Sequence, residues 1–198
     1  MVEYATATMT LPGQAESGDR HLVVRLPRGV LVAAVDGLGH GEEAAVASEV
    51  AVRSLERNAK EPLLALLRRC HEELVGTRGV VMSLATIGSP KGMVSWVGIG
   101  NVEGLLLRAG ASRRGADASL LLRRGVVGVR LPAVAVSVVP LVAGDTLIFA
   151  TDGIRSDFAH GINGLDPPQE IADGILARHR KGTDDALVLV ARYVGGEP

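Results

Sequence analysis

The order of the apolar segments is the feature of this chain that most restricts its fold. Segments typical of β-strands come in two groups, separated by two stretches in which apolar residues recur at helical spacing. The first of these helices is expected to begin after Gly41 and the second at Pro62. A short helix is expected after Asp152, and a longer one over residues 168–179. We predict strands over residues 2–9, 21–26, 30–35, 80–87, 93–99, 102–108, 119–123, 134–138, 146–150 and 185–194.

Strands that are grouped with strands favour antiparallel pairing. The pattern therefore predicts an α+β fold, in which mainly antiparallel sheets carry helices on their outer faces. The sequence has no Pro-, Gly- or Ser-rich linker between two halves and no visible internal repeat. We expect a single domain over residues 1–198.

Composition argues against several classes of function. The chain carries 21 Lys and Arg against 22 Asp and Glu, so it has no basic excess for binding nucleic acid. A single cysteine excludes an internal disulfide, and the five histidines lack zinc-type spacing. No apolar run reaches the ~18–20 residues of a membrane helix, and residues 1–10 do not resemble a signal peptide. We expect a cytoplasmic protein that binds neither nucleic acid nor membranes.

Acidic residues stand at the ends of four predicted strands. Asp19 precedes the second strand, Asp36 follows the third, Asp152 follows the run LIFAT, and Asp184 and Asp185 precede the apolar part of the last strand. Strand ends can meet at one sheet edge, so these carboxylates are expected to converge. Such a cluster favours a neutralising cation, and oxygen donors select Mg²⁺ or Mn²⁺ over Zn²⁺. Taken singly, each acid is more typical of a turn or a helix cap.

Four short motifs occur along the chain: SGD at residues 17–19, DGLGHG at 36–41, ATDGI at 150–154 and DDA at 184–186. In this order they resemble the metal-dependent serine/threonine protein phosphatases of type 2C, and most closely the bacterial branch typified by SpoIIE. The small size and the run WVGIGNVEG (residues 96–104) are similar to the stand-alone phosphatases that act on the stressosome, a stress-sensing complex. The resemblance implies a layered α-β-β-α sandwich and leaves no residues for a sensor domain.

The resemblance also implies a centre for two Mn²⁺ or Mg²⁺ ions. Asp36 would bridge both ions, Asp19 and the Gly37 carbonyl would complete one site, and Asp152 and Asp184 would complete the other. Catalysis would depend above all on Asp36 and Asp152. Eukaryotic relatives carry a phosphate-binding arginine before their first acid, but no arginine precedes Asp19 here. The phosphate contact would therefore fall to the metals or to another residue.

The implied reaction is the hydrolysis of phosphoserine or phosphothreonine. Two ions roughly 3.5–4 Å apart would hold a bridging water and lower its pKa, and the resulting hydroxide would attack phosphorus in line. No protein nucleophile is needed, and Cys70 falls on an apolar helical stripe where a buried thiol is inert. His40 is expected to support the start of the helix, or to contact the metal ligands without contacting the metal, rather than to donate a proton. Arg20 and Arg155 are candidates for the phosphate contact.

Two other enzyme classes are disfavoured. An aspartyl-phosphate mechanism needs a second acid two residues after the strand-end aspartate, where this chain has Leu38. A nucleotide-binding loop needs a helix after its glycines, whereas Gly98, Gly100 and Gly104 precede three leucines and are more typical of a bulge or turn. The remaining alternative is a phosphatase-fold binding module that regulates a stress-signalling partner without catalysis.

The resemblance implies phosphorylated stressosome scaffold or antagonist proteins as substrates. We expect the phosphatase to be a monomer. Residues 110–118 (GASRRGADA) are expected to form a surface loop, with substrate recognition as the alternative.

Overall fold

The computed structural model of the chain describes residues 1–88, 92–109 and 117–195. Within these residues, the helices predicted from the sequence are all confirmed, as are most of the strands. In chain order the elements are β1 (Val2–Met9), β2 (Asp19–Leu26), β3 (Gly29–Gly37), α1 (Glu42–Arg57), α2 (Leu63–Glu73), β4 (Val80–Ile87), β5 (Met93–Ile99), β6 (Glu103–Leu107), β7 (Ala118–Ser119), β8 (Leu122–Arg123), β9 (Ser137–Pro140), β10 (Thr146–Ala150), the 3₁₀ helix η1 (Ser156–Ala159), α3 (Pro168–His179) and β11 (Ala186–Tyr193).

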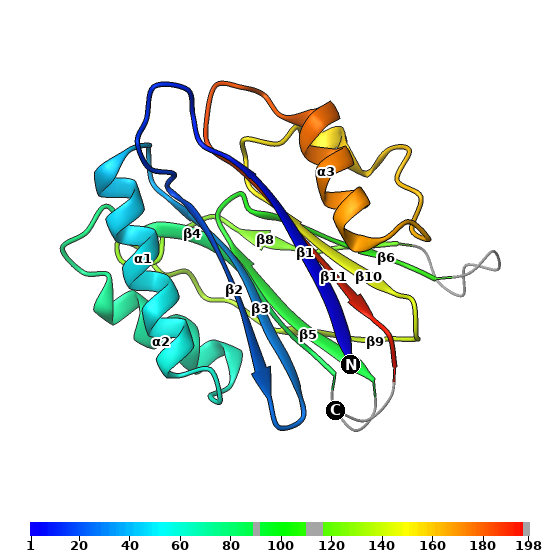
Figure 1. Ribbon diagram of the computed structural model, residues 1–198. Coiled ribbons are helices and arrows are strands. Elements are labelled where there is room, and N and C mark those ends of the chain that lie inside the picture. The colour runs from blue at the N-terminus through cyan, green and yellow to red at the C-terminus, as the bar shows by residue number, and fades with distance from the viewer. Residues whose placement is uncertain (89–91, 110–116, 196–198) are drawn as a thin grey trace.

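The strands form two sheets that are covered by helices on their outer faces (Figure 1). One sheet has the order β1-β11-β10-β6-β7, and the other has the order β2-β3-β4-β5-β8, with β9 also paired to β5. Neighbouring strands are antiparallel except for the parallel pair β5 and β8. Helices α1 and α2 pack on the second sheet and α3 packs on the first. The predicted α-β-β-α sandwich with two mainly antiparallel sheets is therefore confirmed.

Strand β3 shows how the apolar pattern produces these layers. Successive side chains of a strand point to opposite faces of the sheet. Leu31, Ala33 and Val35 pack with the residues of α1 and α2, whereas Val32 and Ala34 pack between the two sheets. All five side chains are fully buried. A strand covered on both faces needs an uninterrupted apolar run, and this is what the sequence has before Asp36.

The prediction of one continuous strand over residues 119–123 is wrong, because the structure divides this segment between the two sheets. Its first part, β7, pairs with β6, and its second part, β8, pairs with β5. The crossing brings Leu120 into the core between the sheets, against two glycines. A Cβ atom on Gly98 would lie 2.8 Å from Leu120 Cδ2, and one on Gly104 would lie 2.9 Å from Leu120 Cβ. These glycines therefore make room for the crossing segment.

The strand predicted over residues 134–138 is displaced toward the C-terminus. The observed strand, β9, pairs with residues 93–96 of β5. Val134 and Val136 are instead partly buried against the core beneath α1 and α2. The predicted surface loop at residues 110–118 lies outside the described residues except for its last two positions. None of the helices in the described part of the chain combines the length and apolar character needed to cross a lipid bilayer.

Candidate metal centre

The first two acidic motifs lie side by side in the second sheet. Asp19 at the start of β2 is the register partner of Asp36 near the end of β3. Residues opposite each other on antiparallel strands point to the same face, so two like charges are placed together. Burial raises the pKa of Asp36 to about 9, with the Asp19 charge as the next cause. Burial also raises the pKa of Asp19 to about 7. Burial and the neighbouring negative charges therefore both oppose ionisation of this pair of carboxyl groups.

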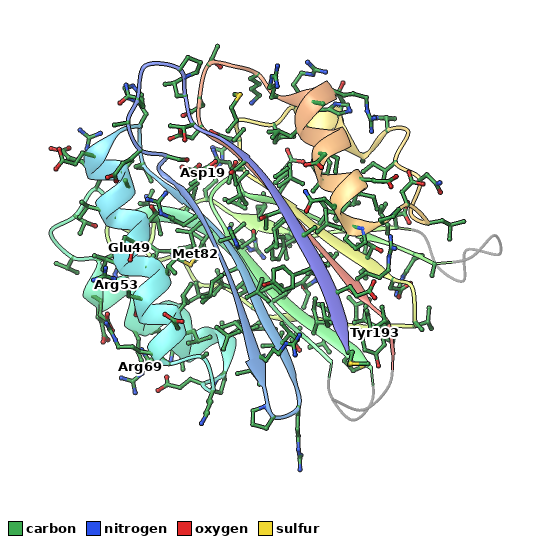
Figure 2. All side chains as sticks on the ribbon, in the orientation of Figure 1. Asp19, Glu49, Arg53, Arg69, Met82 and Tyr193 are labelled. Atoms are coloured by element: carbon green, nitrogen blue, oxygen red, sulfur yellow. The ribbon has the colours of Figure 1, made fainter. Side chains whose placement is uncertain are left out.

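The first sheet brings further carboxylates to the same place. Asp152 follows β10 and Asp184 precedes β11, and the charges of both act on Asp36 and Asp19. Burial raises the pKa of Asp152, and the Asp184 charge adds to the effect. The Lys181 ammonium group and a 2.8 Å hydrogen bond from the Asn101 amide oppose it. The structure thus brings together acids from both sheets, at the end of the sandwich where Figure 2 labels Asp19.

Gly37 lies directly beneath the first turn of α1. Its N–H donates a hydrogen bond to the carbonyl oxygen of Gly18 at 3.1 Å. A Cβ atom on Gly37 would lie only 2.1 Å from the carbonyl oxygen of Ala44, so no side chain fits at this position. Gly41, which precedes α1, has a φ of 78°, and His40 beside it is exposed. The motif that carries Asp36 is therefore a tight strand-to-helix connection.

Two residues support the acids: Thr151, which was not predicted from the sequence, and Asp185, which was expected to lie with the other acids. The Thr151 hydroxyl donates a hydrogen bond to Asp19 Oδ2 at 2.7 Å. Both carboxylate oxygens of Asp185 accept backbone N–H bonds, from Leu11 and from Gly18, each at 2.7 Å. Asp185 therefore fastens the connection between β1 and β2 to the first sheet. Both residues stand inside recognised motifs, but their partners lie more than 130 positions away, where local spacing carries no signal.

The two arginines considered for phosphate contact are occupied by other groups. Arg20 Nη1 donates to the carbonyl oxygens of Ser17 and Asp19, at 2.6 Å and 3.1 Å. Arg155 Nη2 donates to the carbonyl oxygen of Arg178 at 2.6 Å. These bonds tie Arg20 to the segment before β2 and Arg155 to the C-terminal end of α3. The Lys181 ammonium group is a further cation near the site, since its charge acts on Asp152.

The lone thiol is not a candidate nucleophile. Cys70 is fully buried on the inner face of α2, and burial raises the pKa of its thiol to about 12. A thiol protonated at neutral pH and closed off from solvent does not attack a substrate.

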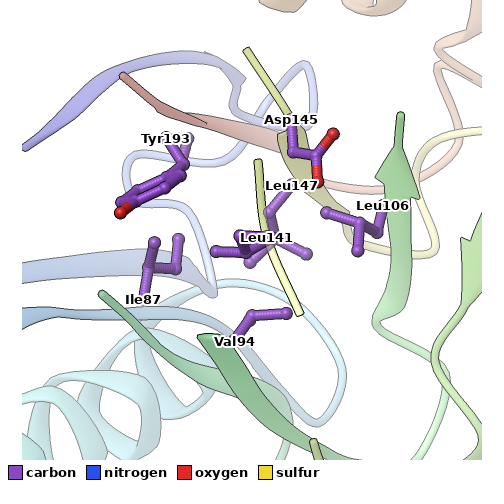
Figure 3. A pocket seen from close by; sticks show the side chains of 8 residues that line it. Ile87, Val94, Leu106, Leu141, Asp145, Leu147 and Tyr193 are labelled. Atoms are coloured by element: carbon purple, nitrogen blue, oxygen red, sulfur yellow. The ribbon is translucent and has the colours of Figure 1, made fainter. Parts of the chain in front are cut away.

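Figure 3 shows a small pocket whose lining includes Leu147 near the start of β10 and Tyr193 at the end of β11, whereas the acids lie at the opposite ends of these two strands. Its lining is apolar apart from Asp145 and Tyr193. The Asp145 carboxylate is already bonded to Arg108 Nη1 at 2.6 Å and to the N–H groups of Ala109 and Val142. This acid is therefore part of a closed structural cluster.

The acid cluster fits a hard divalent cation in charge and in donor chemistry. Its side-chain donors are carboxylate oxygens, which suit Mg²⁺ and Mn²⁺. Among the described residues, no three His, Cys, Asp or Glu side chains are gathered into a finished metal-binding group. Like charges that are placed together repel and raise one another's pKa. The raised pKa values of Asp19 and Asp36 record that repulsion together with their burial.

The comparison with known families decides the assignment. The family described as Stage II sporulation protein E (SpoIIE) matches residues 27–194. The chain belongs to the SpoIIE family. No curated protein sequence matches this SpoIIE-family chain.

Solved structures confirm the fold of this SpoIIE-family protein. One, described as "The bacterial stressosome: a modular system that has been adapted to control secondary messenger signaling", is 29% identical with a TM-score of 0.87, covering 97% of this chain and 100% of that one. RsbX in complex with magnesium is 19% identical with a TM-score of 0.85, covering 96% and 94%. The catalytic domain of the phosphatase PstP with two manganese ions is 21% identical with a TM-score of 0.69, covering 98% and 99%. The sandwich is thus the fold of bacterial type 2C phosphatases.

Proposed function

We propose that this SpoIIE-family chain is a Mn²⁺- or Mg²⁺-dependent phosphatase that removes phosphate from phosphoserine and phosphothreonine. The convergence of acids from both sheets carries the proposal, because burial and neighbouring charges raise the pKa of Asp19 and Asp36, and a bound cation favours the ionised form of such acids. The shared fold of RsbX with magnesium and of PstP with two manganese ions supports it.

In this proposal, the ions would be held by Asp36 together with Asp19 and the Gly37 carbonyl at one site, and by Asp36 together with Asp152 and Asp184 at the other. When bound, such ions act as Lewis acids toward the phosphoryl group and make water a nucleophile at neutral pH. The protein contributes fixed oxygen donors, and it needs no covalent nucleophile of its own.

The surrounding residues hold these donors in place. Asn101 fixes one oxygen of Asp152 through its amide, and Asp185 holds the backbone of Gly18 beside Asp19. Gly37 allows α1 to close over the backbone that follows Asp36. Rigid support of this kind positions metal ligands before substrate arrives.

Hydrolysis of p-nitrophenyl phosphate tests the proposal. The wild-type protein should release p-nitrophenol with Mn²⁺ and not with EDTA. Asp36→Asn and Asp152→Asn should each lose at least about 100-fold in rate, because each removes a charge that holds the ions. Asp173→Asn, at an exposed position of α3, is the matched control and should keep full activity. Full activity in the Asp36 and Asp152 variants would contradict the proposal.

The same assay separates catalysis from a binding module without metals. That alternative draws on the open arrangement of the acids, which forms no finished metal-binding group among the described residues. It predicts a folded wild-type protein that is inactive at every Mn²⁺ concentration.

We also propose phosphorylated stressosome scaffold or antagonist proteins as the substrates, with residues 1–198 acting as one monomeric phosphatase domain. The 29% identity to the structure described as part of work on the bacterial stressosome supports this substrate class. Mass spectrometry of candidate phosphoproteins incubated with the enzyme tests it. Loss of phosphate from a stressosome protein is expected. Loss only from unrelated phosphoproteins would leave the phosphatase activity and refute this choice of substrate.

A further inference from the structure

The hydroxyl group of Thr151 is held in a defined orientation between the two sheets. Its oxygen accepts the backbone N–H of Leu187 at 2.8 Å. Its single proton is directed to Asp19 Oδ2 at 2.7 Å, whereas the alternative acceptor, the Leu187 carbonyl, lies at 3.4 Å. Shorter, charge-assisted hydrogen bonds are the stronger ones. Since Thr151 is 1% exposed and Asp19 is 6% exposed, water has little access to this bond.

This bond joins the two halves of the acid cluster. Thr151 follows β10 of the first sheet, and Asp19 opens β2 of the second. Across the described residues, Thr151 is the one side chain that donates to the Asp19 carboxylate. The bond engages Oδ2, and no donor from residues 1–88, 92–109 or 117–195 reaches Oδ1. One carboxylate oxygen is therefore anchored while the other remains available.

We infer that Thr151 is a positioning residue, whose hydroxyl anchors one oxygen of Asp19 and so directs the other toward a divalent cation. This inference rests on the proposed function. Some residues hydrogen-bond a metal ligand without contacting the metal. Their removal commonly lowers metal affinity by 10- to 100-fold. Thr151 would contribute in this way without touching either the ion or the substrate.

Mn²⁺ binding to the full chain, measured by isothermal titration calorimetry, tests the inference. Thr151→Val keeps the shape of the side chain and removes the hydroxyl, so it should weaken Mn²⁺ binding by about 10-fold or more. Thr151→Ser retains the hydroxyl and should bind within about 3-fold of wild type. Thr146→Val is the matched control, because Thr146 is also 1% exposed, lies at the other end of β10 and donates to the Gly144 carbonyl. Its Mn²⁺ affinity should be unchanged.

The outcomes distinguish this inference from the proposed function. Failure of the wild-type protein to bind Mn²⁺ would overturn both. Wild-type affinity in Thr151→Val, or weak binding in Thr151→Ser, would overturn the positioning role alone. Thr151→Ala is a second variant in case Thr151→Val does not fold. If neither folds while Thr146→Val does, the hydroxyl is required for folding and the positioning role is refuted.

Discussion

Replacing Asp36 with asparagine should make the metal-free protein more stable while removing its response to Mn²⁺. Asp36 is packed opposite Asp19 and interacts with the charges of Asp152 and Asp184. An asparagine has nearly the same shape and carries no charge. The substitution therefore removes the cost of burying an ionisable carboxyl group beside other acids, together with an ion ligand.

The pKa of Asp36 gives the sign and size of this effect. Its pKa rises from the ordinary value of 3.8 to about 9 in the folded protein, chiefly through burial. Between these values the folded state binds more protons than the unfolded state, so the free energy of unfolding falls as pH rises, by about 1.4 kcal/mol per pH unit for each retained proton. The loss accumulated by pH 7 is on the order of 4 kcal/mol. Since the amide also needs partners, we expect a net gain of about 2 kcal/mol, or roughly 4–8 °C in Tm.

Urea unfolding in EDTA at pH 5, 7 and 8.5 measures this prediction. The advantage of Asp36→Asn over wild type should be small at pH 5 and should grow toward pH 8.5. Asp173→Asn, at the exposed control position, should stay within about 0.5 kcal/mol of wild type. Adding Mn²⁺ should stabilise the wild-type protein most at high pH, where fewer protons compete, and should leave Asp36→Asn unchanged. A metal-free Asp36→Asn protein that is less stable than wild type at pH 8.5 would refute the reasoning.

Two further predictions concern the backbone around the acids. Gly37→Ala places a methyl group 2.1 Å from the Ala44 carbonyl oxygen. It should lower the free energy of unfolding, measured in urea, by about 2–3 kcal/mol. A change below about 0.5 kcal/mol would show that α1 shifts to accept the methyl group. Asp185→Ala leaves the N–H groups of Leu11 and Gly18 without their acceptor. Hydrogen exchange at these two amides should therefore accelerate. Unchanged protection would show that Asp185 does not hold the connection between β1 and β2.

Local pattern was sufficient to predict the helices and most of the strands, whereas the layered sandwich was implied by the family resemblance. The apolar run before Asp36 predicted a strand, and the structure buries that strand on both faces and extends it to Gly37. The acids expected at strand ends do lie within electrostatic range of one another, since the charges of Asp152 and Asp184 act on the pKa of both Asp19 and Asp36. Their roles as metal ligands remain predictions.

The features that the sequence did not predict depend on contacts between distant segments. Leu120 crosses from one sheet to the other because Gly98 and Gly104 leave room for it, and neither glycine is near it in sequence. Thr151 acquires its role from Asp19, which lies in the opposite sheet. Periodicity reports which face of an element is buried, but it does not report which residue of another sheet lies across from it.

The number of Mn²⁺ ions bound by the wild-type chain tests the central claim most directly. Equilibrium dialysis at pH 8, followed by metal analysis of the protein, gives this number. We expect two ions per chain for the wild-type protein and fewer than one for Asp36→Asn, because Asp36 is the acid proposed to contact both ions. A wild-type protein that binds no Mn²⁺ at millimolar concentration, or an Asp36→Asn variant that binds two ions, would contradict the account.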